Sequence, residues 1–164
     1  MLVLGIDPGS VHTGYALVDR DRGRYLLRSA GAIHTNTKAD IPSRLLTIFQ
    51  GLQSLLTLHQ PQVVSIEAIF RHKSSESALR LGQARGVALL AAAQAGVPVF
   101  EYNNMTVKKS VTGSGSADKV QLARMVRLLV GADESLTADA TDAIGIAITH
   151  LAHAKHHAIV RSLT

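Results

Sequence analysis

The sequence predicts one α/β domain over residues 1–164, with a five-stranded mixed sheet flanked by helices on both faces and a tail that frays from about residue 154. Three extended apolar segments open the chain, later apolar segments alternate with helical patterns, and the chain is 46% hydrophobic but only 18% charged. Successive strands joined by short turns pair antiparallel, whereas strand–helix–strand units require parallel crossovers. A sheet built from both is mixed, and its crossover helices cover its faces.

Three strands are predicted at the start of the chain. Residues 2–7 form a continuous apolar run that ends in Asp7, as in a buried strand. A Pro-Gly-Ser turn separates this run from a hairpin partner at 13–18, and residues 25–33 supply the third strand. The short turns favour antiparallel pairing of these three segments.

The middle of the chain alternates between helices and strands. A helix is predicted over about 40–60, because aspartate and proline open it, its apolar residues have helical spacing and a proline follows it. A short strand follows at 63–67. A second helix starts at Ser74 or Ser75 and ends before a Gly-Val-Pro sequence, and residues 97–102 form the fifth strand.

Two helices complete the predicted order. A polar connector leads to Ser116, which is the expected N-cap of a helix that runs through Val130. Thr137 is the expected cap of the last helix, which continues to about His153.

Composition narrows the functional classes. The chain has no cysteine, which excludes disulfides, thiolate nucleophiles and cysteine-ligated metal sites. Its longest apolar run, residues 87–93, is far shorter than the roughly 18 residues of a membrane span, and no signal peptide is recognisable. A net charge of +5 favours a polyanionic partner such as nucleic acid. We expect a cytoplasmic protein that does not contact a membrane.

Four of the twelve acidic residues lie where acids are uncommon. Asp7 and Glu67 each end an apolar strand, and Asp139 and Asp142 enter the most apolar part of the last helix, three residues apart on one face. Acids that end parallel neighbouring strands converge at one edge of the sheet, and the helical pair joins them if the last helix packs there. Asp139 has an ordinary alternative role, because the helix dipole favours an acid in the first turn.

A pocket of four carboxylates predicts a metal site. Two like charges about 4 Å apart repel by about 4 kcal/mol at an effective dielectric near 20, so protons or cations must neutralise them. Oxygen ligands select a hard ion, which makes Mg²⁺ or Mn²⁺ the expected cofactor. Two such ions, about 3.5–4 Å apart, catalyse in-line displacement at phosphorus. The candidate reaction is phosphodiester hydrolysis.

Longer strings of residues resemble the RuvC-type Holliday junction resolvases, which are members of the retroviral-integrase and ribonuclease H-like superfamily. The similar strings cover nearly the whole chain in family order: 5–10 (GIDPGS), 13–15 (TGY), Ile66 and Glu67 with Phe70, 77–87 (SALRLGQARGV), 98–102 (PVFEY), 107–108 (VK), 113–117 (GSGSA) and 139–150.

The resemblance implies a ribonuclease H-like fold and a homodimer that resolves four-way DNA junctions by paired symmetric nicks in recombination and repair. It places the family's catalytic, metal-binding carboxylates on Asp7, Glu67, Asp139 and Asp142. It also implies a bacterial, nucleoid-associated setting, with a branch-migration motor complex as a candidate partner.

An aromatic residue with basic neighbours is the first candidate DNA contact. Phe70 lies just past a strand end and is followed by Arg71 and Lys73. Such a side chain can stack on an unpaired base, worth about 1–3 kcal/mol per base. A core position is the alternative for Phe70, and the resemblance favours stacking at the opened centre of a junction.

A second basic segment contains Lys108, Lys109 and Lys119. Between residues 108 and 127 there are five Lys and Arg residues and one acid. The segment flanks a Gly-Ser-Gly-Ser stretch, whose backbone amides at a helix start could hold a phosphate. A solvated helix face is the ordinary alternative. By resemblance, Lys108 and Lys119 are the cations nearest the scissile phosphate.

Two glycines indicate a close contact. Gly82 and Gly86 are four residues apart in a predicted helix, where glycine costs about 1 kcal/mol relative to alanine. Close backbone approach explains them, either to the chain's own sheet or to a second subunit. The resemblance favours the subunit contact.

Histidines cluster near the C-terminus without an assigned role. Three of them share a helical face and could bind a transition metal, but surface positions are the commoner explanation. The cluster consists of His150, His153, His156 and His157.

Two other functions compete with the nuclease. A phosphate-binding ATPase of the actin and sugar-kinase type is one, because residues 7–14 resemble the first phosphate loop of those proteins. They normally need two such domains, and the pair Asp139 and Asp142 has no place in them. A non-catalytic junction-binding protein is the other, and it gives no reason for four acids in apolar surroundings.

Overall fold

The computed structural model describes residues 1–68 and 75–161, and side chains up to residue 154. Its five strands form one mixed sheet in the order β3-β2-β1-β4-β5. β1 pairs antiparallel with β2 and parallel with β4, which pairs parallel with β5, so the predicted mixed sheet is confirmed. The strands are β1 (Val3–Asp7), β2 (His12–Asp21), β3 (Arg24–His34), β4 (Val63–Glu67) and β5 (Val99–Tyr102).

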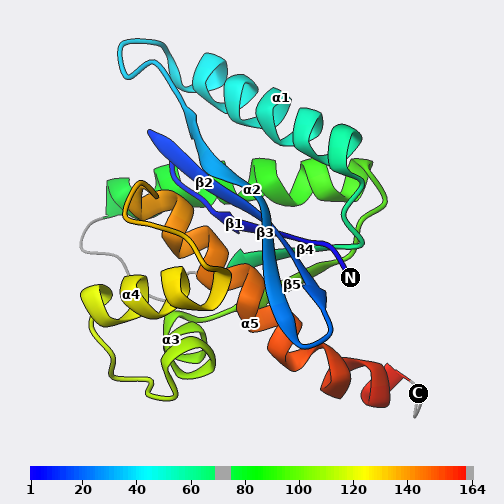
Figure 1. Ribbon diagram of the computed structural model, residues 1–164. Coiled ribbons are helices and arrows are strands. Elements are labelled where there is room, and N and C mark those ends of the chain that lie inside the picture. The colour runs from blue at the N-terminus through cyan, green and yellow to red at the C-terminus, as the bar shows by residue number, and fades with distance from the viewer. Residues whose placement is uncertain (69–74, 162–164) are drawn as a thin grey trace.

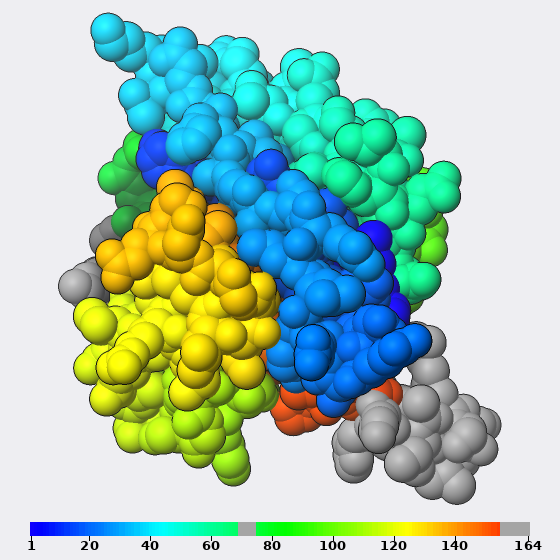
Figure 2. All heavy atoms as spheres, viewed as in Figure 1, coloured from blue at the N-terminus to red at the C-terminus, as the bar shows by residue number. Residues whose placement is uncertain are grey.

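Helices cover both faces of the sheet, as predicted (Figure 1). α1 (Ile41–His59) and α2 (Ser75–Gln94) pack on one face, where Ile48, Leu52 and Ala88 bury the apolar side chains of β1, β2 and β4. α5 (Ala138–Arg161) packs on the other face and is covered in turn by α3 (Asn104–Thr112) and α4 (Lys119–Val130). Figure 2 shows α3 and α4 on one side of the β2–β3 hairpin and α1 on the other.

Two strand glycines allow α5 to lie directly on the sheet. A Cβ atom on Gly5 would collide with the carbonyl oxygen of Ala143, and one on Gly14 would collide with that of Asp139. Glycine in a strand interior permits such close backbone approach. The approach brings the first two turns of α5 against the ends of β1 and β2.

The structure corrects the predicted connector between the fifth strand and the next helix. Part of it forms α3, which begins at the N-cap Asn103 and ends at Gly113 with φ of 81°. Only Val107 and Val111 of this helix are buried, so its sequence carries little helical periodicity. A short helix of this kind gives a weak signal.

Two helix ends also differ from the prediction. Asp118, not Ser116, caps α4: its side chain accepts from the Gln121 amide at 2.8 Å, and the Gln121 side chain returns a reciprocal bond. The Ser116 hydroxyl instead contacts that of Ser114 at 3.0 Å. The last helix continues past His153, since neither proline nor glycine follows that residue. Thr137 does cap it, accepting from the Ala140 amide at 3.3 Å.

Candidate active site

The sheet edge brings two acids side by side. Asp7 ends β1 and Glu67 ends β4, and these parallel neighbours are in register from Val3 opposite Val63 to Ile6 opposite Ile66. The following residues therefore leave the sheet at the same edge. Asp142 reaches this edge from the second turn of α5, because Gly5 and Gly14 allow that helix to approach.

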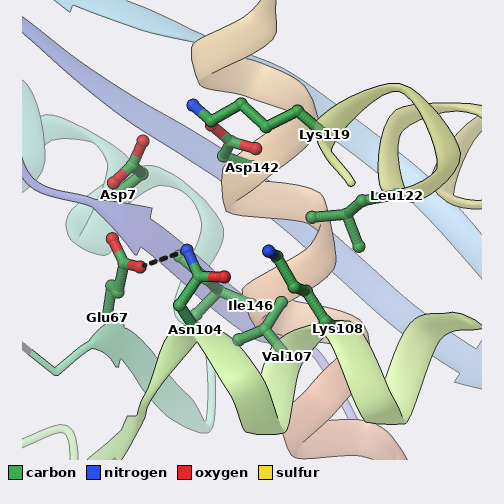
Figure 3. A pocket seen from close by; sticks show the side chains of 9 residues that line it. All are labelled: Asp7, Glu67, Asn104, Val107, Lys108, Lys119, Leu122, Asp142 and Ile146. Carbon is green, nitrogen blue, oxygen red and sulfur yellow. Dashed lines mark hydrogen bonds and ion pairs between the residues drawn. The ribbon is translucent and has the colours of Figure 1, made fainter. Parts of the chain in front are cut away.

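A single pocket collects these side chains (Figure 3). Its volume is about 220 Å³, and its floor is apolar, formed by Val107, Leu122 and Ile146. Its polar lining consists of three acids, two lysines and an amide: Asp7, Glu67, Asp142, Lys108, Lys119 and Asn104. The acids come from β1, β4 and α5, whereas the other three come from α3 and α4.

Asp139 stands just outside this lining. Its backbone carbonyl packs on Gly14, and its charge acts on both Asp7 and Asp142. All four predicted carboxylates are therefore electrostatically connected, with three of them on one pocket wall.

Burial and mutual repulsion raise the pKa values of two acids in the pocket, Asp7 and Asp142. The pKa of Asp7 is raised to about 8, chiefly by burial and then by the charges of Glu67, Asp142 and Asp139. A side-chain hydrogen bond with Glu67 acts in the same direction, because it favours a protonated Asp7. Burial also raises the pKa of Asp142, while the charge of Lys119 opposes the rise and that of Asp139 adds to it.

Lys119 forms an ion pair with an acid of this cluster. Its Nζ lies 3.8 Å from Asp142 Oδ2, although its side chain is largely exposed. No lysine or arginine lies close to Asp142 in the sequence. The ion pair forms because the start of α4 lies against α5. Within residues 1–68 and 75–154, this is the one ion pair that an acid of the cluster forms, so Lys119 offsets one of several negative charges.

The donor set fits a hard divalent ion, because it is all oxygen and carries unneutralised charge. The side chains as they stand are not yet arranged around an ion: no three Asp, Glu or His side chains within residues 1–68 and 75–154 are grouped closely enough to hold one. The pocket thus contains carboxylates that repel one another, and their side chains must move before they can coordinate an ion.

Comparisons with known proteins agree with this geometry. A family described as crossover junction endodeoxyribonuclease RuvC matches residues 3–150. The chain belongs to this family. Relatives of that name from Citrifermentans bemidjiense and Proteus mirabilis are 42% and 49% identical to it, covering 99% and 91% of this chain and 99% and 86% of theirs.

Solved structures extend the agreement to three dimensions. T. thermophilus RuvC in complex with a Holliday junction substrate superposes with a TM-score of 0.90 at 33% identity, over 96% of each chain. The expected ribonuclease H-like fold of the RuvC family is confirmed. Membership of a family of endodeoxyribonucleases also favours the nuclease function over the ATPase-like alternative.

The predicted DNA contacts of this RuvC-family chain divide into three groups. Lys108 and Lys119 line the pocket (Figure 3). Lys109 is exposed and lies outside the lining, so its DNA contact stays a prediction. The proposed stacking and basic residues at the end of β4 lie outside the described residues: Phe70, Arg71 and Lys73.

Gly82 and Gly86 face away from the chain's own sheet. A Cβ atom at either position would meet nothing within 4 Å. Packing against the sheet therefore does not explain them, and a contact with a second subunit stays a prediction. Leu79 and Leu90 lie on the same exposed face of α2, with 63% and 60% of their surface accessible.

The surface prediction is wrong for His150, which is only 2% exposed. Its Nδ1 lies 2.8 Å from the Tyr102 hydroxyl, and its ring packs on Phe100 at 4.6 Å between centroids. His153 is half-buried, with Nε2 2.9 Å from the Ser110 hydroxyl. Both join α5 to neighbouring elements because this face of α5 is covered by β5 and α3.

The side chains of His156 and His157 lie outside the described residues. No helix in the described part of the chain is long and apolar enough to cross a membrane.

Sequence reasoning missed Asn104. Its Nδ2 donates to Glu67 Oε1 at 3.2 Å from the first turn of α3 (Figure 3). The spacing of Asn104 and Lys108, one helical turn apart, would have indicated a shared face, but only once a helix was assigned there.

Proposed function

We propose that this chain resolves four-way DNA junctions by metal-dependent hydrolysis of phosphodiester bonds, using Asp7, Glu67, Asp139 and Asp142. One observation carries the proposal: acids from three separate elements share a pocket with the ammonium groups of Lys108 and Lys119. Carboxylates bind hard ions and lysines bind phosphate, so the lining suits a phosphodiester held on divalent ions. Membership of the RuvC family supports four-way junctions as the substrate.

Two Mg²⁺ ions are the proposed cofactors, with Mn²⁺ able to replace them. Bound ions would activate a water molecule and stabilise the leaving 3′ oxygen. Asp7, the acid with the most strongly raised pKa, would hold the ions together with Glu67, Asp139 and Asp142.

The lysines have a separate task in this scheme. Lys108 reaches the pocket from α3 and Lys119 from the start of α4, so both can contact the phosphate from the side opposite the strand ends. Lys119 lies 3.8 Å from Asp142 Oδ2, and its ammonium would be available to the DNA if that carboxylate held an ion instead. Lys109, Phe70, Arg71 and Lys73 are proposed to contact the substrate outside the pocket.

We propose that two copies act together through α2. Paired nicks in a two-fold substrate require two active sites related by symmetry. The exposed face of α2 carries Leu79, Gly82, Gly86 and Leu90 at helical spacing, and the glycines leave room for close approach of a second helix. A cytoplasmic, nucleoid-associated setting and a branch-migration motor as partner remain predictions.

The test is incubation with a labelled four-way junction, with and without Mg²⁺, and with ATP in a parallel reaction. We expect paired nicks only with the metal, and no ATP turnover. Tight junction binding without nicks under any divalent ion would instead indicate a non-catalytic binding protein. ATP hydrolysis without DNA cleavage would indicate the kinase-like alternative.

A further inference from the structure

The face of α3 that lines the pocket presents both an amide and an ammonium group. Asn104 and Lys108 lie one helical turn apart, with Val107 between them on the apolar floor. The Asn103 cap, which accepts from the Thr106 amide at 2.8 Å, fixes the start of this helix. The side chains of Asn104 and Lys108 therefore approach the carboxylates from a common rigid support.

Two hydrogen bonds connect this support to the end of β4. Asn104 Nδ2 donates to Glu67 Oε1 at 3.2 Å, and the backbone amide of Ala68 donates to the carbonyl of Tyr102 at 2.8 Å. The backbone bond fixes the separation between the end of β4 and the residues that lead into α3. With that separation fixed, the side-chain bond sets the orientation of one carboxylate oxygen.

We propose that Asn104 is a positioning residue that holds Glu67 for a divalent ion. Because Nδ2 engages Oε1, the second oxygen of Glu67 is left to face Asp7 and the pocket. The proposal deepens the proposed function, since it rests on the carboxylate cluster being the ion site. Partners of this kind orient metal ligands without touching the metal.

An amide suits this role better than a cation would. A lysine or arginine bonded to Glu67 would also neutralise it, and the cluster would lose attraction for an ion. Asn104 fixes the carboxylate and leaves its charge intact. By occupying Oε1, it also keeps Glu67 from pairing with Lys108, whose ammonium makes no ion pair within the described residues.

The test compares Asn104→Ala with the wild-type chain in two measurements. The first is the midpoint of thermal stabilisation by MnCl₂ or MgCl₂ without DNA, and the second is the Mg²⁺ dependence of junction cleavage. We expect the half-saturating metal concentration to rise about 10- to 100-fold in both, the range typical for loss of a ligand's orienting partner. Cleavage at saturating metal should recover to within a few-fold, and metal-free junction binding should not change.

Two further variants separate positioning from a general effect on α3. Asn104→Gln keeps the amide and should restore part of the metal affinity. Met105→Ala changes a side chain that is 69% exposed in the same helical turn and does not line the pocket, so it should titrate like the wild-type chain.

An unchanged metal midpoint in Asn104→Ala would overturn the proposal. So would a fall in metal-free melting temperature without a change in the metal midpoint, because that pattern belongs to a structural role. If the wild-type chain binds neither ion, the metal site of the proposed function fails instead.

Discussion

Replacing Asp7 by asparagine should stabilise the metal-free chain while abolishing cleavage. The pKa of about 8 in the folded chain lies far above 3.8, the ordinary value of an aspartate, so folding disfavours the ionised carboxylate. The amide removes the charge, keeps the shape and can still donate to Glu67, as the protonated acid does. The substitution thus removes repulsion without opening a cavity.

The pKa shift sets the size of the effect. Each pKa unit corresponds to about 1.4 kcal/mol, and at pH 7 the unfolded carboxyl is ionised while the folded one mostly holds its proton. The linkage cost at that pH is about 4 kcal/mol for an isolated group of this pKa. At about 2–4 °C per kcal/mol, the melting temperature of Asp7→Asn should rise on the order of 10 °C.

The stability gain of Asp7→Asn should depend on pH in a defined direction. A raised folded pKa means that stability is lost as pH rises from the unfolded to the folded value. The gain of Asp7→Asn over the wild-type chain should therefore be small near pH 4, grow up to about pH 8 and then level off. Thermal unfolding in EDTA between pH 4 and 9 measures this directly.

Asp133 is a suitable control, because its pKa is shifted in the opposite direction from that of Asp7. The hydrogen bonds from Ser135 lower the pKa of Asp133, so Asp133→Asn should give no gain at any pH. Adding Mg²⁺ should stabilise the wild-type chain and largely fail to stabilise Asp7→Asn. Equal or lower melting temperatures for Asp7→Asn throughout the pH range would refute the cost of burying the Asp7 charge beside other acids, on which this reasoning depends.

Four further substitutions test the carboxylate pocket, the close packing of α5 on the sheet and the proposed dimer contact through α2. Asp142→Asn should remove cutting yet preserve junction binding in gel-shift assays, because it deletes a ligand and lessens repulsion of phosphate; wild-type cleavage would contradict its role. Lys119→Ala should lower the salt slope of junction binding by about 1 if the ammonium contacts phosphate, and an unchanged slope would remove that contact. Gly14→Ala would collide with the Asp139 carbonyl, so we expect a melting temperature several degrees lower and weaker metal binding in thermal-shift titrations; unaltered values would mean that α5 need not approach so closely. Gly86→Glu should shift light-scattering mass from dimer to monomer with intact circular dichroism, since its own chain leaves that position open, and a persistent dimer would place the interface elsewhere.

The carboxylate pocket could be predicted because strand periodicity and register are local properties. Asp7 and Glu67 each follow four buried residues, and parallel pairing of such strands leaves little choice about where their ends meet. The docking of α5 is less evident from the sequence, although Gly5 and Gly14 inside β1 and β2 are a signal of close approach.

Other features depend on contacts that no local pattern encodes. The pairing of Lys119 with Asp142 joins residues far apart in the chain, and it depends on how α4 lies against α5. His150 is polar, which favours a helix surface, yet Tyr102 and Phe100 cover it. The short helix α3 is fixed by its caps Asn103 and Gly113 more than by apolar spacing, which concealed Asn104.

Repulsion in the metal-free pocket and affinity for ions have the same physical origin. The energy that raises the pKa of Asp7 is stored when folding buries this carboxyl and brings Glu67 and the acids of α5 beside it. An ion that neutralises them recovers that energy on binding, so the pocket gains affinity at the expense of metal-free stability. The contacts of the acids with the rest of the protein fit this relation between affinity and stability. Asn104, which is neutral, bonds to Glu67, and Lys119 pairs with Asp142. Full neutralisation of the acids by protein cations would stabilise the fold and remove the attraction for an ion. Stabilising the metal-free protein at this edge should therefore weaken the nuclease.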